Sequence, residues 1–274
     1  GGKAVIIGDS KSMKSEALFR RFGKFVNSLA GKYITAEDVG INPTDMSWVS
    51  METDYVVGLP GKSGDPSPVT AFGVYMGMKA CAQQQFGSDS LAGKTVAVQG
   101  VGHVGEYLVK HLTAEGAKVY VTDIQEDTLK RVASQYGANV VGLNDIYDVD
   151  MDIYAPCALG ATVNDETLKR LKCSIISGAA NNQLANEKIH GQIVMEKGII
   201  YAPDFALNAG GVINCYSEVA GLSADWAMRK SEDIYGTISS IVSRSKSENI
   251  PTYQIANKMA EERIQSIGNI KLPL

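Results

Sequence analysis

A glycine-rich turn between two apolar segments, within residues 94–123, constrains the fold of this chain more than any other feature. The segment before it, Thr95–Gln99, is short, β-branched and apolar. In the segment after it, apolar residues recur every four positions, as Val104, Leu108 and Leu112. The pattern predicts a strand, a tight turn and a helix.

The glycines of this turn, Gly100, Gly102 and Gly105, have the spacing G-x-G-x-x-G. That spacing is typical of a dinucleotide site, where the glycines allow a tight turn, approach of a pyrophosphate and close packing of helix on strand. The backbone N–H groups at the start of the helix would face the phosphates, which places Val101, His103 and Val104 in the predicted site. The alternative is an ordinary structural turn, and for the His103 side chain we expect a solvent-facing position.

Asp123 completes the dinucleotide pattern. It follows a second predicted strand, Lys118–Thr122, and stands 18 positions after Gly105. A carboxylate at this place can accept hydrogen bonds from both ribose hydroxyls and repels a 2′-phosphate. The sequence therefore predicts NAD as the cofactor in preference to NADP.

Composition excludes several classes of function. With 26 Lys and Arg against 30 Asp and Glu, the net charge of −4 offers no basic field for nucleic acid. The apolar runs have the length of strands, so we expect no membrane span. The four cysteines are widely spaced and the three histidines scattered. This pattern favours reduced thiols in the cytoplasm and predicts no metal site.

Strands and helices alternate along most of the chain, which predicts an α/β fold with a doubly wound parallel sheet of the Rossmann type. The further predicted strands are 139–141, 152–155, 174–177 and 198–201, and the predicted helices are 66–86, 126–136, 224–245 and 253–267. Ligands of such sheets bind beyond the carboxyl ends of the strands. The loops expected there are 156–160, which contains Ala158, 178–182 with Asn181, and 208–211 with Asn208. They suit contact with a ribose or a carboxamide, although ordinary βα turns would look alike.

A cluster of Gly, Pro and Ser at residues 58–66 predicts a domain boundary near residue 58. We assign residues 1–57 to a second, smaller α/β domain and residues 58–250 to the dinucleotide-binding domain, and we expect residues 251–274 to pack back on the first. In the smaller domain, Ala4–Gly8 is predicted to be a buried strand, and Thr44 to cap a short helix.

The segments GGKAVIIGD, ITAEDVG, DPSPVTAFGV, GKTVAVQGVGHVG, DIYAPCALGA, SGAANNQL and PDFALNAGGVIN resemble the glutamate/leucine/phenylalanine/valine dehydrogenase family over nearly the whole chain. The resemblance is strongest to members that act on L-leucine. It implies reversible, NAD-dependent oxidative deamination of a branched-chain L-amino acid to its 2-oxo acid and ammonia. It also implies assembly into a homo-oligomer.

The resemblance assigns roles to particular residues. Lys3 corresponds to the catalytic lysine that activates water, and Asp38 to its acid/base partner. Asn181 and Asn208 correspond to residues that orient substrate and nicotinamide, and Thr70 to one near the carboxamide. Without the resemblance, the residues alone would indicate that Lys3 is a solvated lysine at the start of a strand and that Asp38 caps a helix or turn.

Substrate preference depends on three positions that match the side-chain pocket of the family, Ala36, Val212 and Cys215. Small and apolar residues leave room for an aliphatic side chain, and none of the three is a cation that would pair with a second carboxylate, which disfavours glutamate. Leucine, isoleucine and valine differ by about one methylene, worth only ~1–3 kcal/mol, so the order among them does not follow from sequence. Phenylalanine is also compatible with this pocket.

Two departures from the family pattern stand out. The chain starts inside the glycine-rich motif that contains Lys3, so we expect it to lack the first part of the amino-terminal substrate domain. His103 occupies a position where asparagine is common in the family. The competing hypothesis is therefore a non-catalytic NAD-binding fragment, against which the joint presence of Lys3 and Asp38 argues.

Overall fold

A computed structural model describes residues 2–10, 12–38, 40–59 and 64–269. The chain divides into two compact units. Unit 1 comprises Gly1–Pro66 and Val212–Ala227, and unit 2 comprises Ser67–Gly211 and Met228–Leu274. Each unit has a core of its own, so each is described by itself.

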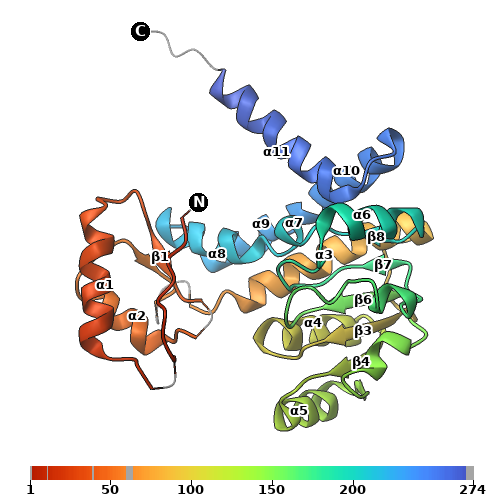
Figure 1. Cartoon of the computed structure of the whole chain (residues 1–274), viewed down its shortest axis with the longest axis horizontal. Helices are drawn as coiled ribbons and strands as arrows, with labels where there is room; N and C mark the ends of the chain where they lie inside the picture. Colours follow the sequence, from red (N-terminus) through yellow and green to blue (C-terminus); the bar gives the residue numbers. More distant parts are fainter. Residues whose placement is uncertain (1, 11, 39, 60–63, 270–274) are drawn as a thin grey trace. The chain divides into compact units, whose positions relative to one another are not determined.

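Unit 1 is a small α/β unit around a pair of parallel strands, β1 (Thr35–Ala36) and β2 (Val56–Val57). Helix α1 (Glu16–Ser28) and helix α2 (Pro43–Ser50) pack on each other (Figure 1). Their apolar side chains form a compact core with a residue of β2, namely Phe19, Met46, Val49 and Val56. Most of helix α8 (Gly210–Val219) also belongs to this unit.

Two details of unit 1 differ from the sequence-based predictions. Residues 4–8, all within the described part, lie outside any strand, and Val5 and Ile7 are 80% and 95% exposed. An apolar run becomes a strand only where a neighbouring strand satisfies its backbone, so composition alone was insufficient here. Helix α2 is capped by Asn42, which forms a capping box with Asp45, and not by Thr44.

Unit 2 contains a parallel sheet with the strand order β5-β4-β3-β6-β7-β8. These strands are β3 (Thr95–Gln99), β4 (Lys118–Thr122), β5 (Asn139–Val140), β6 (Ile153–Pro156), β7 (Ile175–Ile176) and β8 (Ile200–Tyr201). The chain moves outward from β3 in one direction and then returns to continue from β6 in the other. The predicted doubly wound α/β fold is therefore confirmed, and its strand order reverses between β3 and β6.

Helices cover the sheet of unit 2. They are α3 (Ser67–Phe86), α4 (His103–Ala114), α5 (Glu126–Tyr136), α6 (Glu187–Glu196), α7 (Asp204–Leu207), α10 (Asp233–Glu248) and α11 (Thr252–Gly268), with the 3₁₀ turns η1 (Asp145–Asp148) and η2 (Thr167–Lys169); α9 (Ala224–Ser231) spans the change of units. Helix α3 packs between α10 and α4 (Figure 1). An apolar cluster in unit 2 includes one side chain from each of four neighbouring strands, namely Ala97, Tyr154, Ile176 and Tyr201.

The division into units differs from the predicted domains. The first unit extends to Pro66, and residues 212–227, predicted to belong to the second domain, join it. The expectation that residues 251–274 pack on the first domain is wrong for the described part, because α11 contacts α6 and β8 of unit 2. The reason lies in Tyr253 at the start of α11, which is buried in the apolar cluster of that unit.

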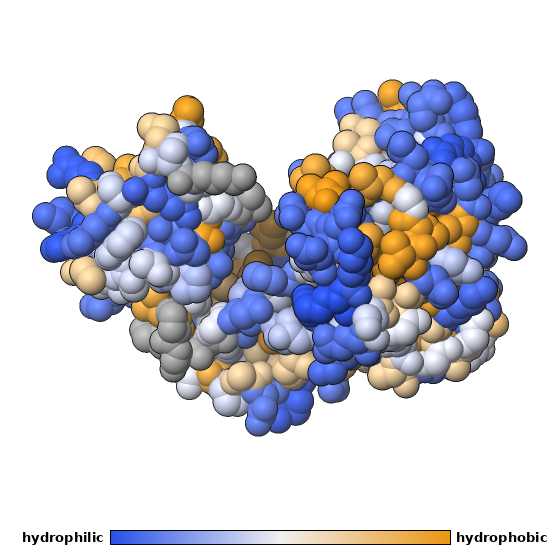
Figure 2. All heavy atoms as spheres, turned by 90° about the horizontal axis from the view of Figure 1, so that it is seen from below, coloured by the Kyte–Doolittle hydropathy of each residue, from blue (hydrophilic) through white to orange (hydrophobic). Residues whose placement is uncertain are grey.

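Hydrophilic residues cover much of the face shown in Figure 2, with apolar residues gathered in patches between them. Large apolar side chains with high exposure include Val5, Ile7 and Val212 in unit 1 and Ile264 in unit 2. Within the described residues, no helix combines the length and apolar character needed to cross a membrane.

Candidate active site

The glycine turn of unit 2 follows β3 and leads into α4, as predicted. Gly100 has a φ of +97°, which favours glycine, and a Cβ there would lie 2.6 Å from the Cβ of Ala158. A Cβ on Gly105 would lie 2.1 Å from the carbonyl oxygen of Gly100. Both glycines are therefore required by close packing, the first against the loop after β6 and the second within the turn.

Gly102 serves a different purpose from its two neighbours. It is the N-cap of α4, and a Cβ there would meet nothing within 4 Å. Open space in front of a helix N-terminus allows an anion to reach the backbone N–H groups. His103, the first residue of α4, has an exposed side chain, whereas Val101 is buried. The turn thus has a shape that fits a pyrophosphate.

Asp123 lies at the carboxyl end of β4, next to the glycine turn. Its two carboxylate oxygens accept hydrogen bonds from the backbone N–H groups of Val101, at 2.7 Å, and Gln125, at 2.8 Å. The carboxylate therefore holds the turn in place. The bond to Val101 is a contact that sequence reasoning missed.

The loops after β6 and β7 meet beside the turn. The backbone N–H of Ala180 donates to the carbonyl oxygen of Pro156 at 2.9 Å. A Cβ on Gly160 would lie 2.6 Å from the carbonyl oxygen of Asn181, so the two loops touch. With Ala158 against Gly100, a continuous row of loops follows the carboxyl ends of β3, β6 and β7, where ligands of this fold bind.

A pair of asparagine amides extends this row. The Nδ2 group of Asn208 donates to Oδ1 of Asn181 at 2.6 Å and to the carbonyl oxygen of Ala179 at 3.1 Å. The backbone of Gly210 lies close to Thr70 at the start of α3, because a Cβ on Gly210 would be 2.8 Å from the Thr70 Cα. The structure thus brings Asn181, Asn208 and Thr70 to the same edge of the sheet.

Two buried polar residues behind these loops were not singled out from the sequence, although both fall within the quoted motifs. Gln183 is fully buried, and its amide donates to the carbonyl oxygens of Gly178 and Ala180. Asp204 accepts hydrogen bonds from the backbone N–H groups of Gln183, at 3.2 Å, and Phe205, at 2.8 Å. Sequence does not reveal that these two polar side chains are buried, and it is their burial that marks them as structurally important.

Lys3 and Asp38 form an ion pair in unit 1, between Lys3 Nζ and Asp38 Oδ2. The two residues are 35 positions apart in sequence, so the fold of unit 1 brings them together. Asp38 follows β1, where the backbone turns through Gly40 with a φ of +77°. The Lys3 and Asp38 side chains are 72% and 50% exposed, which leaves both accessible to a small molecule.

The predicted pocket residues also lie in unit 1. Ala36 is on β1, while Val212 and Cys215 are three positions apart on α8 and thus share a helix face. The backbone N–H of Gly58, just after β2, donates to Glu218 of α8 at 2.8 Å, which ties the helix to the strand pair. Burial raises the pKa of the Cys215 thiol, so this side chain is neutral and weakly polar.

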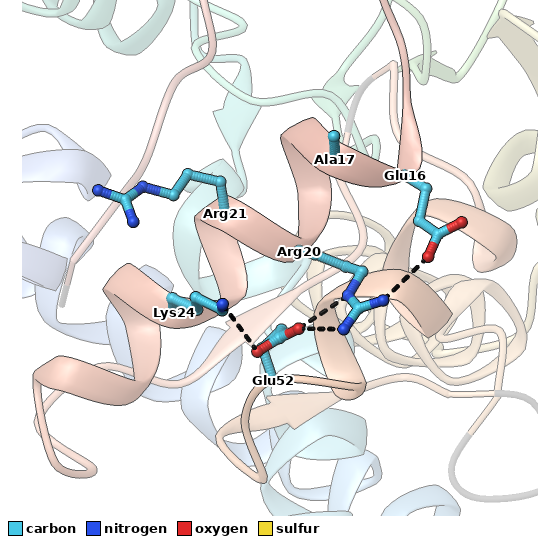
Figure 3. Close-up of a pocket in the computed structure, with 6 residues that line it drawn as sticks. All are labelled: Glu16, Ala17, Arg20, Arg21, Lys24 and Glu52. Atoms are coloured by element: carbon cyan, nitrogen blue, oxygen red, sulfur yellow. Dashed lines mark hydrogen bonds and ion pairs between the residues drawn. The ribbon is translucent and has the colours of Figure 1, made fainter.

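A surface pocket beside α1 is lined by Glu16, Ala17, Arg20, Arg21, Lys24 and Glu52 (Figure 3). Arg20 pairs there with Glu52 at 2.6 Å and with Glu16 at 3.1 Å. None of the predicted site residues lines it. Arg20 and Lys24 pair with these carboxylates, whereas Arg21 lies over the ring of Phe25.

Comparison with known proteins decides the family. The profile described as glutamate/leucine/phenylalanine/valine dehydrogenase matches residues 61–125 and 120–267, and that of the family's dimerisation domain matches residues 1–55. The chain belongs to this family of amino-acid dehydrogenases. The family resemblance predicted from sequence is thus confirmed, while the roles of the individual site residues stay predictions.

Several characterised members of the dehydrogenase family are similar over nearly all of this chain. Leucine dehydrogenase from Bacillus cereus is 53% identical over 98% of the chain and 74% of the relative, and that from Thermoactinomyces intermedius is 54% identical over 97% and 73%. The crystal structure of L-tryptophan dehydrogenase from Nostoc punctiforme superposes with a TM-score of 0.82 at 42% identity. That match covers 93% of this chain and 74% of the other.

Proposed function

We propose that this dehydrogenase catalyses the reversible, NAD-dependent oxidative deamination of L-leucine and other branched-chain L-amino acids to 2-oxo acids and ammonia. Leucine dehydrogenases at 53–54% identity over almost the whole chain support this substrate class. The observation that carries the assignment of residues is the Lys3–Asp38 ion pair, which places an amine and a carboxylate side by side in unit 1.

NAD fits the residues of unit 2. The open approach at Gly102 and the helix start behind it suit the pyrophosphate. Asp123 retains lone pairs for ribose hydroxyls beyond its two backbone contacts, and its negative charge opposes a 2′-phosphate. The exposed amide of Asn181 suits the carboxamide of the nicotinamide. When bound, NAD supplies the acceptor for the hydride that leaves the substrate Cα.

Lys3 and Asp38 perform the proton transfers in the proposed reaction. Asp38 takes a proton from the substrate ammonium group, which frees the nitrogen lone pair as the hydride leaves Cα. Lys3 activates the water that attacks the resulting iminium carbon, and its ammonium form stabilises the oxygen that becomes negative there. Asp38 then returns its proton to the nitrogen of the carbinolamine, and the hydroxyl group releases its proton to solvent water as ammonia leaves, which gives the 2-oxo acid.

The side-chain pocket proposed from Ala36, Val212 and Cys215 explains a preference for aliphatic substrates. These residues are small or apolar, and none carries a charge that would favour glutamate. We further propose that the enzyme is a cytoplasmic homo-oligomer, which is supported by the match of residues 1–55 to the dimerisation domain of the family.

The test measures NADH formation at alkaline pH with L-leucine, L-valine, L-phenylalanine and L-glutamate in turn. The chain is compared with a Lys3→Ala variant and with Lys32→Ala, an exposed lysine of the same unit, as the matched control. We expect activity on the aliphatic substrates, a loss of at least about 100-fold in Lys3→Ala and none in Lys32→Ala.

The other outcomes separate the alternatives. Faster turnover of L-phenylalanine than of L-leucine would reassign the substrate within the family. Binding of NADH without turnover of any amino acid would contradict the proposed activity and indicate a cofactor-binding fragment.

A further inference from the structure

Gln183 occupies an unusual place beside the candidate cofactor site. It is a long polar side chain at 0% exposure, in the loop that carries Asn181. Its Nε2 donates to the carbonyl oxygen of Gly178 at 2.7 Å and to that of Ala180 at 2.9 Å. A buried amide that donates both of its N–H groups to carbonyl oxygens of one loop holds that loop in its shape.

These two hydrogen bonds fix which way the amide of Gln183 points. Both partners are carbonyl oxygens and accept only, so the opposite orientation would set Oε1 against two acceptors. The Gln183 Oε1 atom is buried and has no hydrogen-bond partner among the described residues. Leaving a buried acceptor without a partner is unfavourable, and this cost is tolerated here for the two contacts to the loop.

Asp204 links the same loop to the next one. Its Oδ2 accepts from the backbone N–H of Gln183 and its Oδ1 from that of Phe205, at the start of α7. Helix α7 leads to Asn208, whose amide donates to Asn181. A closed chain of contacts therefore runs from Gln183 through Asp204 and α7 back to Asn181.

We propose that Gln183 and Asp204 are positioning residues that hold the Asn181–Asn208 amide pair in the orientation that receives the nicotinamide. The inference deepens the proposed function and rests on NAD being the cofactor. Gln183 itself is buried behind the loop and acts through Asn181. Asp204 sets the distance between the two loops, because one carboxylate bonds to both.

The experiment compares the binding of NADH with that of ADP-ribose, which lacks the nicotinamide, by calorimetry. The variants are Gln183→Met, which keeps the length and removes the donor, and Asp204→Asn, which keeps one acceptor. Gln192→Met, an exposed glutamine on α6, is the matched control. We expect about tenfold weaker binding of NADH in both site variants, with ADP-ribose binding within about twofold of wild type.

Each outcome bears on a different claim. Equal weakening of NADH and ADP-ribose in both variants would show a general structural defect and overturn the positioning role, as would NADH binding unchanged from wild type. If Gln183→Met does not fold, Asp204→Asn gives the same comparison. Wild-type protein that binds neither ligand would instead contradict the proposed use of NAD.

Discussion

At the scale of single residues, Asp123 has a structural role in addition to the ribose-binding role proposed for it. Its charge and position suit ribose recognition, and its oxygens also bind the backbone N–H groups of Val101 and Gln125. The first task depends on the negative charge, whereas the second needs only acceptors. Substitutions that remove the negative charge but keep an acceptor oxygen therefore separate ribose recognition from support of the turn.

We predict that Asp123→Ala destabilises the fold by about 1–3 kcal/mol, because the buried Val101 loses its acceptor. Asp123→Asn keeps one acceptor oxygen and should be less destabilised. Both variants should lose much of the preference for NADH over NADPH, since both lose the charge. Denaturant unfolding and binding of both cofactors measure the effects, with Asp127→Asn on α5 as the control. Full selectivity in Asp123→Asn would contradict the role of the charge.

At the scale of elements, the glycine turn gives a matched pair of variants. Gly105→Ala should destabilise the fold by about 1–3 kcal/mol, because its Cβ would overlap the backbone oxygen of Gly100. Gly102→Ala meets open space and should fold normally, but its methyl group would stand where the pyrophosphate approaches. Thermal unfolding and NADH titration distinguish the two. Unchanged NADH affinity in Gly102→Ala would place the pyrophosphate elsewhere.

Glu115 stands at the end of helix α4, and its side chain joins this helix to α3 and to the segment before β3. Burial alone would raise its carboxyl pKa, but hydrogen bonds from Lys79, Tyr75 and the Leu91 N–H outweigh this, and the pKa lies below its ordinary value of 4.5. Its contribution to stability is therefore fully present above about pH 4.5 and is lost as the pH falls through the lower folded pKa.

We predict that Glu115→Gln lowers the free energy of unfolding by about 1–3 kcal/mol at neutral pH, and that the difference from wild type shrinks in acid. Urea unfolding measured from about pH 3 to about pH 7, a range that includes the ordinary pKa of a glutamate carboxyl, checks this prediction. Glu126→Gln, at an 80% exposed position on α5, is the control. A difference that does not change with pH would show that ionisation of Glu115 is irrelevant.

Elements defined by local spacing were predicted well from sequence. The bounds of β3, β4 and α5 agree with prediction because apolar periodicity defines each element and a glycine lies close to at least one end of each. Residues 4–8 were wrongly predicted as a strand, because a strand depends on a partner that sequence does not reveal. For the same reason Gln183 was missed, since its partners are backbone carbonyls whose positions follow from the whole fold.

At the scale of the whole molecule, the chain is two units with unequal cores. Unit 1 is assembled from two separate segments, and its core is a small cluster around Phe19 and Met46. Unit 2 buries a six-stranded sheet beneath helices that contact one another. Because the cofactor contacts proposed above all lie in unit 2, ligand binding should act unequally on the two units.

We predict that amide hydrogen exchange in the intact chain is faster in α1 and α2 than in β3 and β6, because fewer apolar side chains must be exposed to open unit 1. Saturating NADH should slow exchange in β3, β6 and the loop of Asn181, while leaving α1 unchanged. At about 100 times Kd the added protection should approach ~2.7 kcal/mol where exchange requires global unfolding of unit 2. The measurement is exchange followed by mass spectrometry with and without NADH, and AMP serves as a control that lacks the nicotinamide. Equal protection gained in α1 and in β3 would mean that the two units open together, so that cofactor binding in one is felt in full by the other.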